Sequence, residues 1–147
     1  MPDRTLPPPL DRLVTAVNAH DLQALVACFA PDYVNRTPAH PTRGFVGRDQ
    51  VRRNWAQIFT AVPDVRAEIL RFATDAPLVW TEWKISGTRT GDARPFLMAG
   101  ALILEVPEDR TIAAATFYLE PVEHQSGTAD QALRRITGDP TPLKEPS

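Results

Sequence analysis

The sequence predicts one α+β domain in which helices pack on one face of a curved antiparallel sheet. Its 147 residues are enough for a single domain with a sizeable core. Apolar residues recur with a helical period as far as Pro63, and with the alternating period of a strand from Val65 to Pro121. Prolines fall where one pattern ends and the next begins, which is typical of element boundaries.

The first elements expected are two short helices that form a hairpin. Asp11 suits the positive end of the first helix, and Asp21 can cap the second, which ends at Pro31. The apolar face of the first helix consists of Leu10, Leu13, Val14 and Val17. The second helix has the same spacing in Leu22, Leu25, Val26 and Phe29.

A short strand, a loop and a third helix follow the hairpin. Tyr33 to Thr37 alternates as a strand does, and the segment from Pro38 to Gly47 has the proline and glycine content of a loop. The apolar stripe of a third helix begins after Arg48 and stops at Pro63. Its members are Val51, Trp55, Ile58, Phe59 and Val62.

Four longer strands are expected after the third helix. They are Val65 to Ala73, Leu78 to Thr88, Pro95 to Val106 and Thr111 to Pro121. The separators between them are short, so neighbouring strands run antiparallel. The segment from Ala99 to Val106 is apolar on both faces, and both faces therefore need cover. Helices cover one face, and a second copy of the chain is expected on the other.

The two ends of the chain are expected outside the domain. Thr128 to Gln131 resembles a capping box that opens a short C-terminal helix to Ile136, and Gly138 closes this helix. The predicted organisation is a disordered tail at 1–9, a folded domain at 10–123, a helical extension at 124–137 and a second disordered tail at 138–147.

Bulk composition excludes several classes of function. The net charge of −2 argues against a nucleic-acid partner, since phosphate binding favours a basic surface. No apolar run approaches the roughly 20 residues of a membrane span, so no membrane partner is expected. Cys28 is the lone cysteine and no metal or cofactor motif occurs, so neither is expected. Nothing near Met1 marks secretion, which predicts a cytoplasmic location.

Several segments together resemble a known superfamily. They are Asn18 to Leu22 at the turn of the helical hairpin, Phe29 to Asp32, Ala61 to Asp64, and Phe117 to Pro121 in the last strand. They are similar to segments of the nuclear transport factor 2-like superfamily, and within it to the SnoaL-like group of polyketide cyclase relatives. The resemblance covers residues 10–122 and implies a cone-shaped roll of the cystatin type. The superfamily includes isomerases, cyclases, hydrolases, dehydratases and binding domains, so the fold leaves the function open.

The catalytic residues of these relatives carry over only in part. The resemblance implies that the tyrosine and two aspartates of the ketosteroid isomerase relatives fall on Leu13, Thr37 and Leu102. None of these can donate or accept the proton as required, so ketosteroid isomerase activity is not expected. The acid of the SnoaL-type cyclases also falls on Leu102.

One acid of the epoxide hydrolase relatives is retained. The resemblance implies that their arginine and two aspartates fall on Trp80, Glu82 and Phe117, which leaves Glu82 as the candidate proton carrier. Simple alternation along the strand places Glu82 in water beside Lys84. The resemblance instead places the even-numbered residues toward the cavity, and we adopt that arrangement. Burial there would raise the pKa of the carboxyl group toward neutrality.

Further candidate residues surround the expected mouth of the pocket. His40 and Tyr33 complete the candidate catalytic set, and Trp55 and Trp80 are expected to form aromatic walls. The alternative for His40 is an ordinary loop residue, and for the tryptophans an ordinary core position. The expected ligand-binding residues are Asn35, Thr37, Trp55, Phe59, Trp80, Leu102, Phe117 and Leu119.

Two functions remain open at this point. The first is cofactor-free acid–base catalysis centred on Glu82, such as cyclisation, isomerisation, hydration or epoxide opening, in a mostly apolar pocket for a small hydrophobic molecule. The second is a non-catalytic binding or interaction domain. The acids missing at Leu13, Thr37, Leu102 and Phe117 favour it. With either function, a second copy of the chain is expected to pair through the outer face of the sheet.

Overall fold

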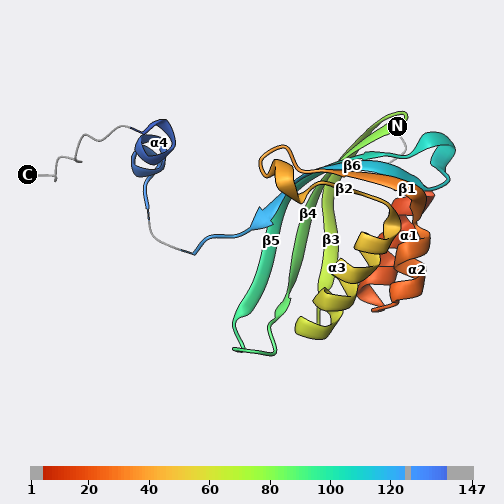
Figure 1. Ribbon diagram of the computed structural model, residues 1–147, viewed down its shortest axis with the longest axis horizontal. Coiled ribbons are helices and arrows are strands. Elements are labelled where there is room, and N and C mark those ends of the chain that lie inside the picture. The colour runs from red at the N-terminus through yellow and green to blue at the C-terminus, as the bar shows by residue number, and fades with distance from the viewer. Residues whose placement is uncertain (1–4, 125–126, 139–147) are drawn as a thin grey trace, which may run out of the picture.

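The computed structural model describes residues 5–124 and 127–138, and it confirms the α+β class (Figure 1). Most of the two predicted tails, residues 1–4 and 139–147, lies outside the described residues. The fold has a helical layer on one side and a strongly curved sheet on the other.

Three helices form the first layer: α1 (Pro8–Asn18), α2 (Leu22–Ala27) and α3 (Arg48–Ala61). α1 begins inside the segment predicted to be a tail, because proline suits the first positions of a helix. The Asp21 carboxylate caps α2 as predicted, since it accepts a hydrogen bond from the Ala24 backbone N–H at 3.0 Å. Two 3₁₀ helices, η1 (Pro41–Arg43) and η2 (Pro107–Asp109), lie in loops.

A six-stranded sheet forms the second layer, in the order β2-β1-β6-β5-β4-β3. The strands are β1 (Phe29–Arg36), β2 (Phe45–Val46), β3 (Arg66–Asp75), β4 (Leu78–Thr88), β5 (Pro95–Glu105) and β6 (Ile112–Pro121). The prediction of a wholly antiparallel sheet is wrong at one pair, because β1 runs parallel to β6. α3 and four strands separate these two in the chain, which provides the long connection that a parallel pair requires.

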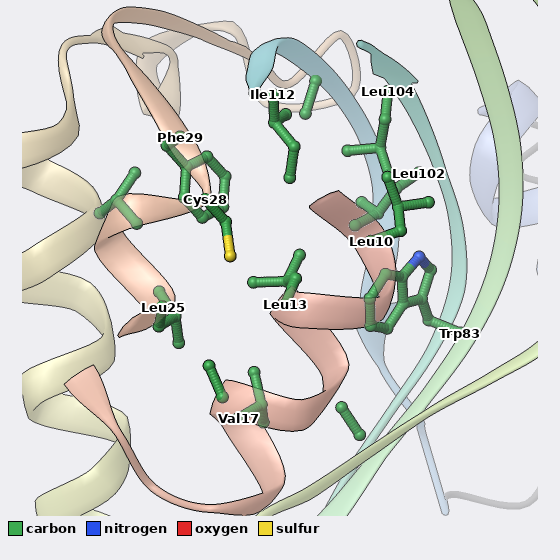
Figure 2. Close-up of a cluster of buried hydrophobic side chains, with 14 of the residues drawn as sticks. Leu10, Leu13, Val17, Leu25, Cys28, Phe29, Trp83, Leu102, Leu104 and Ile112 are labelled. Carbon is green, nitrogen blue, oxygen red and sulfur yellow. The ribbon is translucent and has the colours of Figure 1, made fainter. Parts of the chain in front are cut away.

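The hydrophobic core lies between the helices and the sheet. Figure 2 shows Leu10 and Leu13 of α1 among side chains of the sheet, with Trp83 and Leu102 beside them. Leu10 is fully buried. A fully buried leucine contributes about 2 kcal/mol by leaving water. This packing fixes which face of each strand turns inward, and so it decides which side chains can reach a site under the helices.

A short C-terminal helix, α4 (Ala129–Thr137), follows the sheet. The predicted capping box is confirmed, since Thr128 and Gln131 exchange hydrogen bonds of 2.9 and 3.2 Å between side chain and backbone. Leu133 and Ile136 of this helix are exposed. Over the part of the chain that the structure describes, no helix has the length and hydrophobicity to cross a membrane.

Candidate functional site

A cavity of about 160 Å³ lies between the helices and the inner face of the sheet. Its walls come from α1, α3 and five of the six strands. Among the described residues that line it, all but Asn35 and Asn54 are apolar or aromatic, and none is acidic or basic. The cavity can therefore hold an apolar molecule by excluding water from its surface.

The cavity has a half-exposed mouth and a buried inner end. Trp55 of α3, Phe96 of β5 and Phe117 of β6 are partly exposed and mark the mouth. Trp83 and Leu102 are only 2% and 6% exposed and belong to the inner end. Aromatic side chains at the mouth offer flat apolar surface to an entering ring.

The polar groups at the inner end are Tyr33 and Asn35, which alternate inward on β1. The Tyr33 hydroxyl donates a hydrogen bond of 2.7 Å to Oδ1 of Asn35. Burial raises the pKa of Tyr33 well above its ordinary value, because the phenolate would lose its hydration. The phenol therefore stays neutral at physiological pH and acts as a hydrogen-bond donor.

The prediction that the even-numbered residues of β4 face the cavity is wrong. Trp83 and Ile85 line the cavity, whereas Trp80 is 49% exposed on the other face. Glu82 also lies there, and its Oε1 accepts a hydrogen bond of 2.7 Å from Nε of Arg71. The reason is energetic, since the opposite arrangement would bury charged groups and expose large apolar ones. The simple alternation of apolar and polar residues along β4 predicts the inward-facing residues correctly.

His40 and Thr37 lie together outside the cavity lining. The Thr37 hydroxyl donates to the His40 backbone carbonyl at 2.7 Å. Nε2 of His40 lies 2.9 Å from Oε1 of Glu120. Glu120 is the residue of β6 that follows the inward-facing Leu119. The proposed grouping of His40 with Glu82 and Tyr33 is therefore wrong, because the three side chains do not converge on one space.

Six of the expected site residues do line the cavity: Tyr33, Asn35, Trp55, Leu102, Phe117 and Leu119. Their role in binding stays a prediction. Phe59 is not among the lining residues. Its ring packs instead against the rings of Trp55 and His20, with centroid distances of 5.7 and 5.5 Å. Trp83 and Ile85 were missed, although the alternation of β4 signalled them. Within the described residues, no group of three potential ligands could hold a metal ion.

Solved structures with the same arrangement of elements identify the class of fold. One is a protein from Catenulispora acidiphila with a ketosteroid isomerase-like fold, solved with trimethylamine (20% identity, TM-score 0.66, covering 86% of this chain and 93% of that one). Another, from Shewanella denitrificans, is named as a SnoaL-like polyketide cyclase (13% identity, TM-score 0.62, covering 89% and 96%). A third is a SnoaL-like protein from Burkholderia thailandensis (19% identity, TM-score 0.58, covering 78% and 92%).

At these identities the structural similarity establishes the fold alone, and this fold agrees with the one that the resemblance to the nuclear transport factor 2-like superfamily implies. The sequence itself identifies the family. Residues 10–115 match the SnoaL-like domain, and the chain belongs to this family. No curated protein shows significant sequence similarity to the chain.

Proposed function

We propose that the protein binds a small, mostly apolar molecule in the cavity under its helices, and that it does so without acid–base catalysis. The observation that carries this proposal is the lining, which is apolar except for two amides and one neutral phenol. Acid–base catalysis needs a group that can exchange a proton near neutral pH within reach of the ligand. Glu82, the candidate for that role, is paired with Arg71 on the other face of the sheet.

The size of the cavity limits the ligand to about one ring. Its volume is about 160 Å³. An apolar cavity of about 150 Å³ in another protein stays dry and binds benzene. We therefore expect a molecule of one ring with short substituents, and not one with several fused rings.

The test is a titration of the full chain with toluene, followed by calorimetry and thermal unfolding. Toluene is expected to bind and to raise the melting temperature, because a ligand that binds the folded state alone stabilises it. The matched variant is Ala115→Leu, at a buried lining position of β6, which fills space inside the cavity. This variant is expected to fold and to lose toluene binding. Equal binding by both proteins would contradict the proposal.

We also propose that the outer face of the sheet pairs with a second copy of the chain. Trp80 of β4 and Tyr118 of β6 are 49% and 47% exposed on this face. Between them the middle strand, β5, presents the apolar Ala99, Ala101 and Ile103. Glu82 of β4, beside Ala101, is the charged group among them, and Arg71 pairs with it. Exposed apolar patches of this kind are typical of interfaces.

The charges at the rim of this face favour a two-fold arrangement. Lys84, Ala99 and Glu120 are register partners across β4, β5 and β6. A two-fold axis along β5 would bring Lys84 of each copy opposite Glu120 of the other. Complementary charges at the rim favour such pairing over other orientations.

Light scattering after size exclusion tests this second proposal. The native chain is expected at twice its mass of 16.3 kDa. Ala101→Arg places a long, charged side chain on the middle strand of the outer face and is expected to give a monomer. Ala61→Arg, at an exposed position of α3, is the control and is expected to stay dimeric. A native monomer, or a dimer that survives Ala101→Arg, would refute the pairing.

A further inference from the structure

We infer that the ligand of the cavity carries a hydrogen-bond acceptor oxygen, such as that of a ketone, and that the side-chain amide of Asn35 binds this oxygen. The inference rests on the proposed function and names the chemical class of the ligand. It depends on three observations: a free N–H donor, a contact that holds this donor in place, and apolar surroundings.

Asn35 has an unused donor group in the cavity. Its Oδ1 accepts the hydrogen bond from Tyr33, while Nδ2 makes no hydrogen bond within the described residues. Among the described residues, every fully buried side-chain nitrogen or oxygen has a hydrogen-bond partner. Nδ2 of Asn35 has none, so this atom is not fully buried and a water-sized molecule can reach it. Asn35 is only 7% exposed, alternates inward on β1 and lines the cavity. The cavity is therefore the space from which Nδ2 is reached.

Tyr33 holds the amide in this orientation. The 2.7 Å hydrogen bond occupies the amide oxygen, so the opposite end of the same amide plane, the NH₂ group, is the end left free. The phenol is itself fixed, since Tyr33 is 1% exposed and its ring packs edge-on against Phe29 at a centroid distance of 4.8 Å. A donor held in place before binding costs little entropy when the ligand arrives.

The other polar groups near the cavity are already engaged or lie in water. The indole N–H of Trp83 donates to the Thr81 hydroxyl at 2.6 Å. Asn54 is exposed at the mouth, where its Oδ1 accepts from Gln50 at 2.7 Å. Among the described lining residues, Asn35 is thus the buried one with a free donor.

An unpaired N–H in apolar surroundings is unfavourable, and an acceptor oxygen on the ligand removes this cost. A carbonyl oxygen has two lone pairs and can accept from an amide without a proton being transferred. A cationic or strongly acidic ligand is disfavoured, because no charged side chain among the described residues lines the cavity. A neutral ring that bears a carbonyl group satisfies both conditions.

The test compares two probes of nearly equal shape, acetophenone and α-methylstyrene, which differ by an oxygen in place of a methylene group. Each is titrated calorimetrically into the native chain and into Asn35→Leu. Acetophenone is expected to bind Asn35→Leu about 3- to 10-fold more weakly than the native chain, which is the range of one neutral hydrogen bond. α-Methylstyrene is expected to change by less than about 2-fold or to bind more tightly.

The outcomes separate this inference from the proposed function. If both probes bind the native chain and lose affinity equally in Asn35→Leu, or if neither loses any, the acceptor inference is wrong while the cavity still binds apolar molecules. If neither probe binds the native chain, the proposed function fails and the inference with it.

Two further measurements guard against a variant that does not fold. Asn35→Leu leaves the Tyr33 hydroxyl without its partner, so the double variant Tyr33→Phe/Asn35→Leu, which removes both groups, serves as the second background. In the native chain, the side-chain NH₂ resonances of Asn35 are expected to shift with acetophenone and not with α-methylstyrene. Equal shifts with both probes would overturn the inference without any substitution.

Discussion

Thr81 and Glu82 are neighbours in β4 but lie in opposite surroundings. The Thr81 hydroxyl is buried, donates to the Leu102 carbonyl at 2.7 Å and accepts from the Trp83 indole at 2.6 Å. The Glu82 carboxylate and the Arg71 guanidinium are 39% and 80% exposed, so water competes for their ion pair. One residue step along the strand therefore separates a stabilising contact from a weak one.

This difference predicts the relative cost of two substitutions. Thr81→Val leaves the buried indole N–H of Trp83 without its acceptor and is expected to lower the free energy of unfolding by about 1–3 kcal/mol. Glu82→Gln is expected to change it by less than about 1 kcal/mol and to leave toluene binding unaltered. Urea denaturation measures both. A loss of toluene affinity in Glu82→Gln would contradict this account, because it would show that the Glu82 carboxylate takes part in the binding site.

Tyr33 predicts how stability changes in alkaline solution. Burial raises its pKa in the folded chain, while in the unfolded chain the phenol ionises at about pH 10. The buried, neutral phenol of Tyr33 contributes fully to the free energy of unfolding below that pH. This contribution is lost as the pH rises above it, because ionisation of the phenol then favours the unfolded chain. The expected slope from this group is about 1.4 kcal/mol per pH unit. Denaturation between pH 9 and pH 11 should show a shallower slope in Tyr33→Phe, and identical slopes would argue against a buried phenol.

At the scale of elements, Gly100 sets the approach of β5 to β6. Its φ of 143° is one that other residues rarely adopt. A Cβ at this position would overlap the Tyr118 carbonyl oxygen and lie 2.9 Å from the Leu119 Cα. The two strands that form the floor of the cavity can lie this close only because position 100 has no side chain.

Gly100→Ala is therefore expected to lower the free energy of unfolding by about 3 kcal/mol or more, from backbone strain and overpacking together. Gly91→Ala is the matched control. It lies in the β4–β5 turn, and an added Cβ there would meet no atom within 4 Å. Urea denaturation of the two variants should differ clearly, and equal stabilities would contradict the close approach.

The bounds of most elements could be predicted because their patterns are local. β4 has the predicted bounds, Leu78–Thr88, since a turn residue or a proline lies near each end of a long alternating run. β1 begins at Phe29, earlier than predicted, because the apolar spacing of α2 continues through this residue and hides the boundary. The parallel pairing of β1 with β6 was not predictable, since it joins segments distant in sequence.

The inward face of β4 was predictable from alternation alone, and the resemblance led away from it. Val79, Trp83 and Ile85 are apolar and buried, as their pattern indicates. The hydrogen bond between Tyr33 and Asn35 is different in kind, because no pattern states that two inward residues of one strand touch. Such a contact depends on rotamers that only the packed cavity determines.

At the scale of the whole molecule, the two faces of the curved sheet differ in what they contact. Its inner face and the helices enclose the cavity, and its outer face presents Trp80 and Tyr118. Loss of pairing through the outer face need not abolish binding, because no lining residue comes from the row of Lys84, Ala99 and Glu120. Ala101→Arg, if monomeric, is therefore expected to bind toluene within about 3-fold of the native affinity, a difference of less than 1 kcal/mol. A complete loss of binding would link the two faces.

The most direct test of the central claim is the position of a bound apolar molecule. We expect nuclear Overhauser contacts from toluene to the methyl groups of Leu102 and to the ring protons of Trp83 and Phe117, which lie around one space under the helices. Contacts confined to Trp80 and Tyr118 on the outer face, with none to the inner set, would contradict the account.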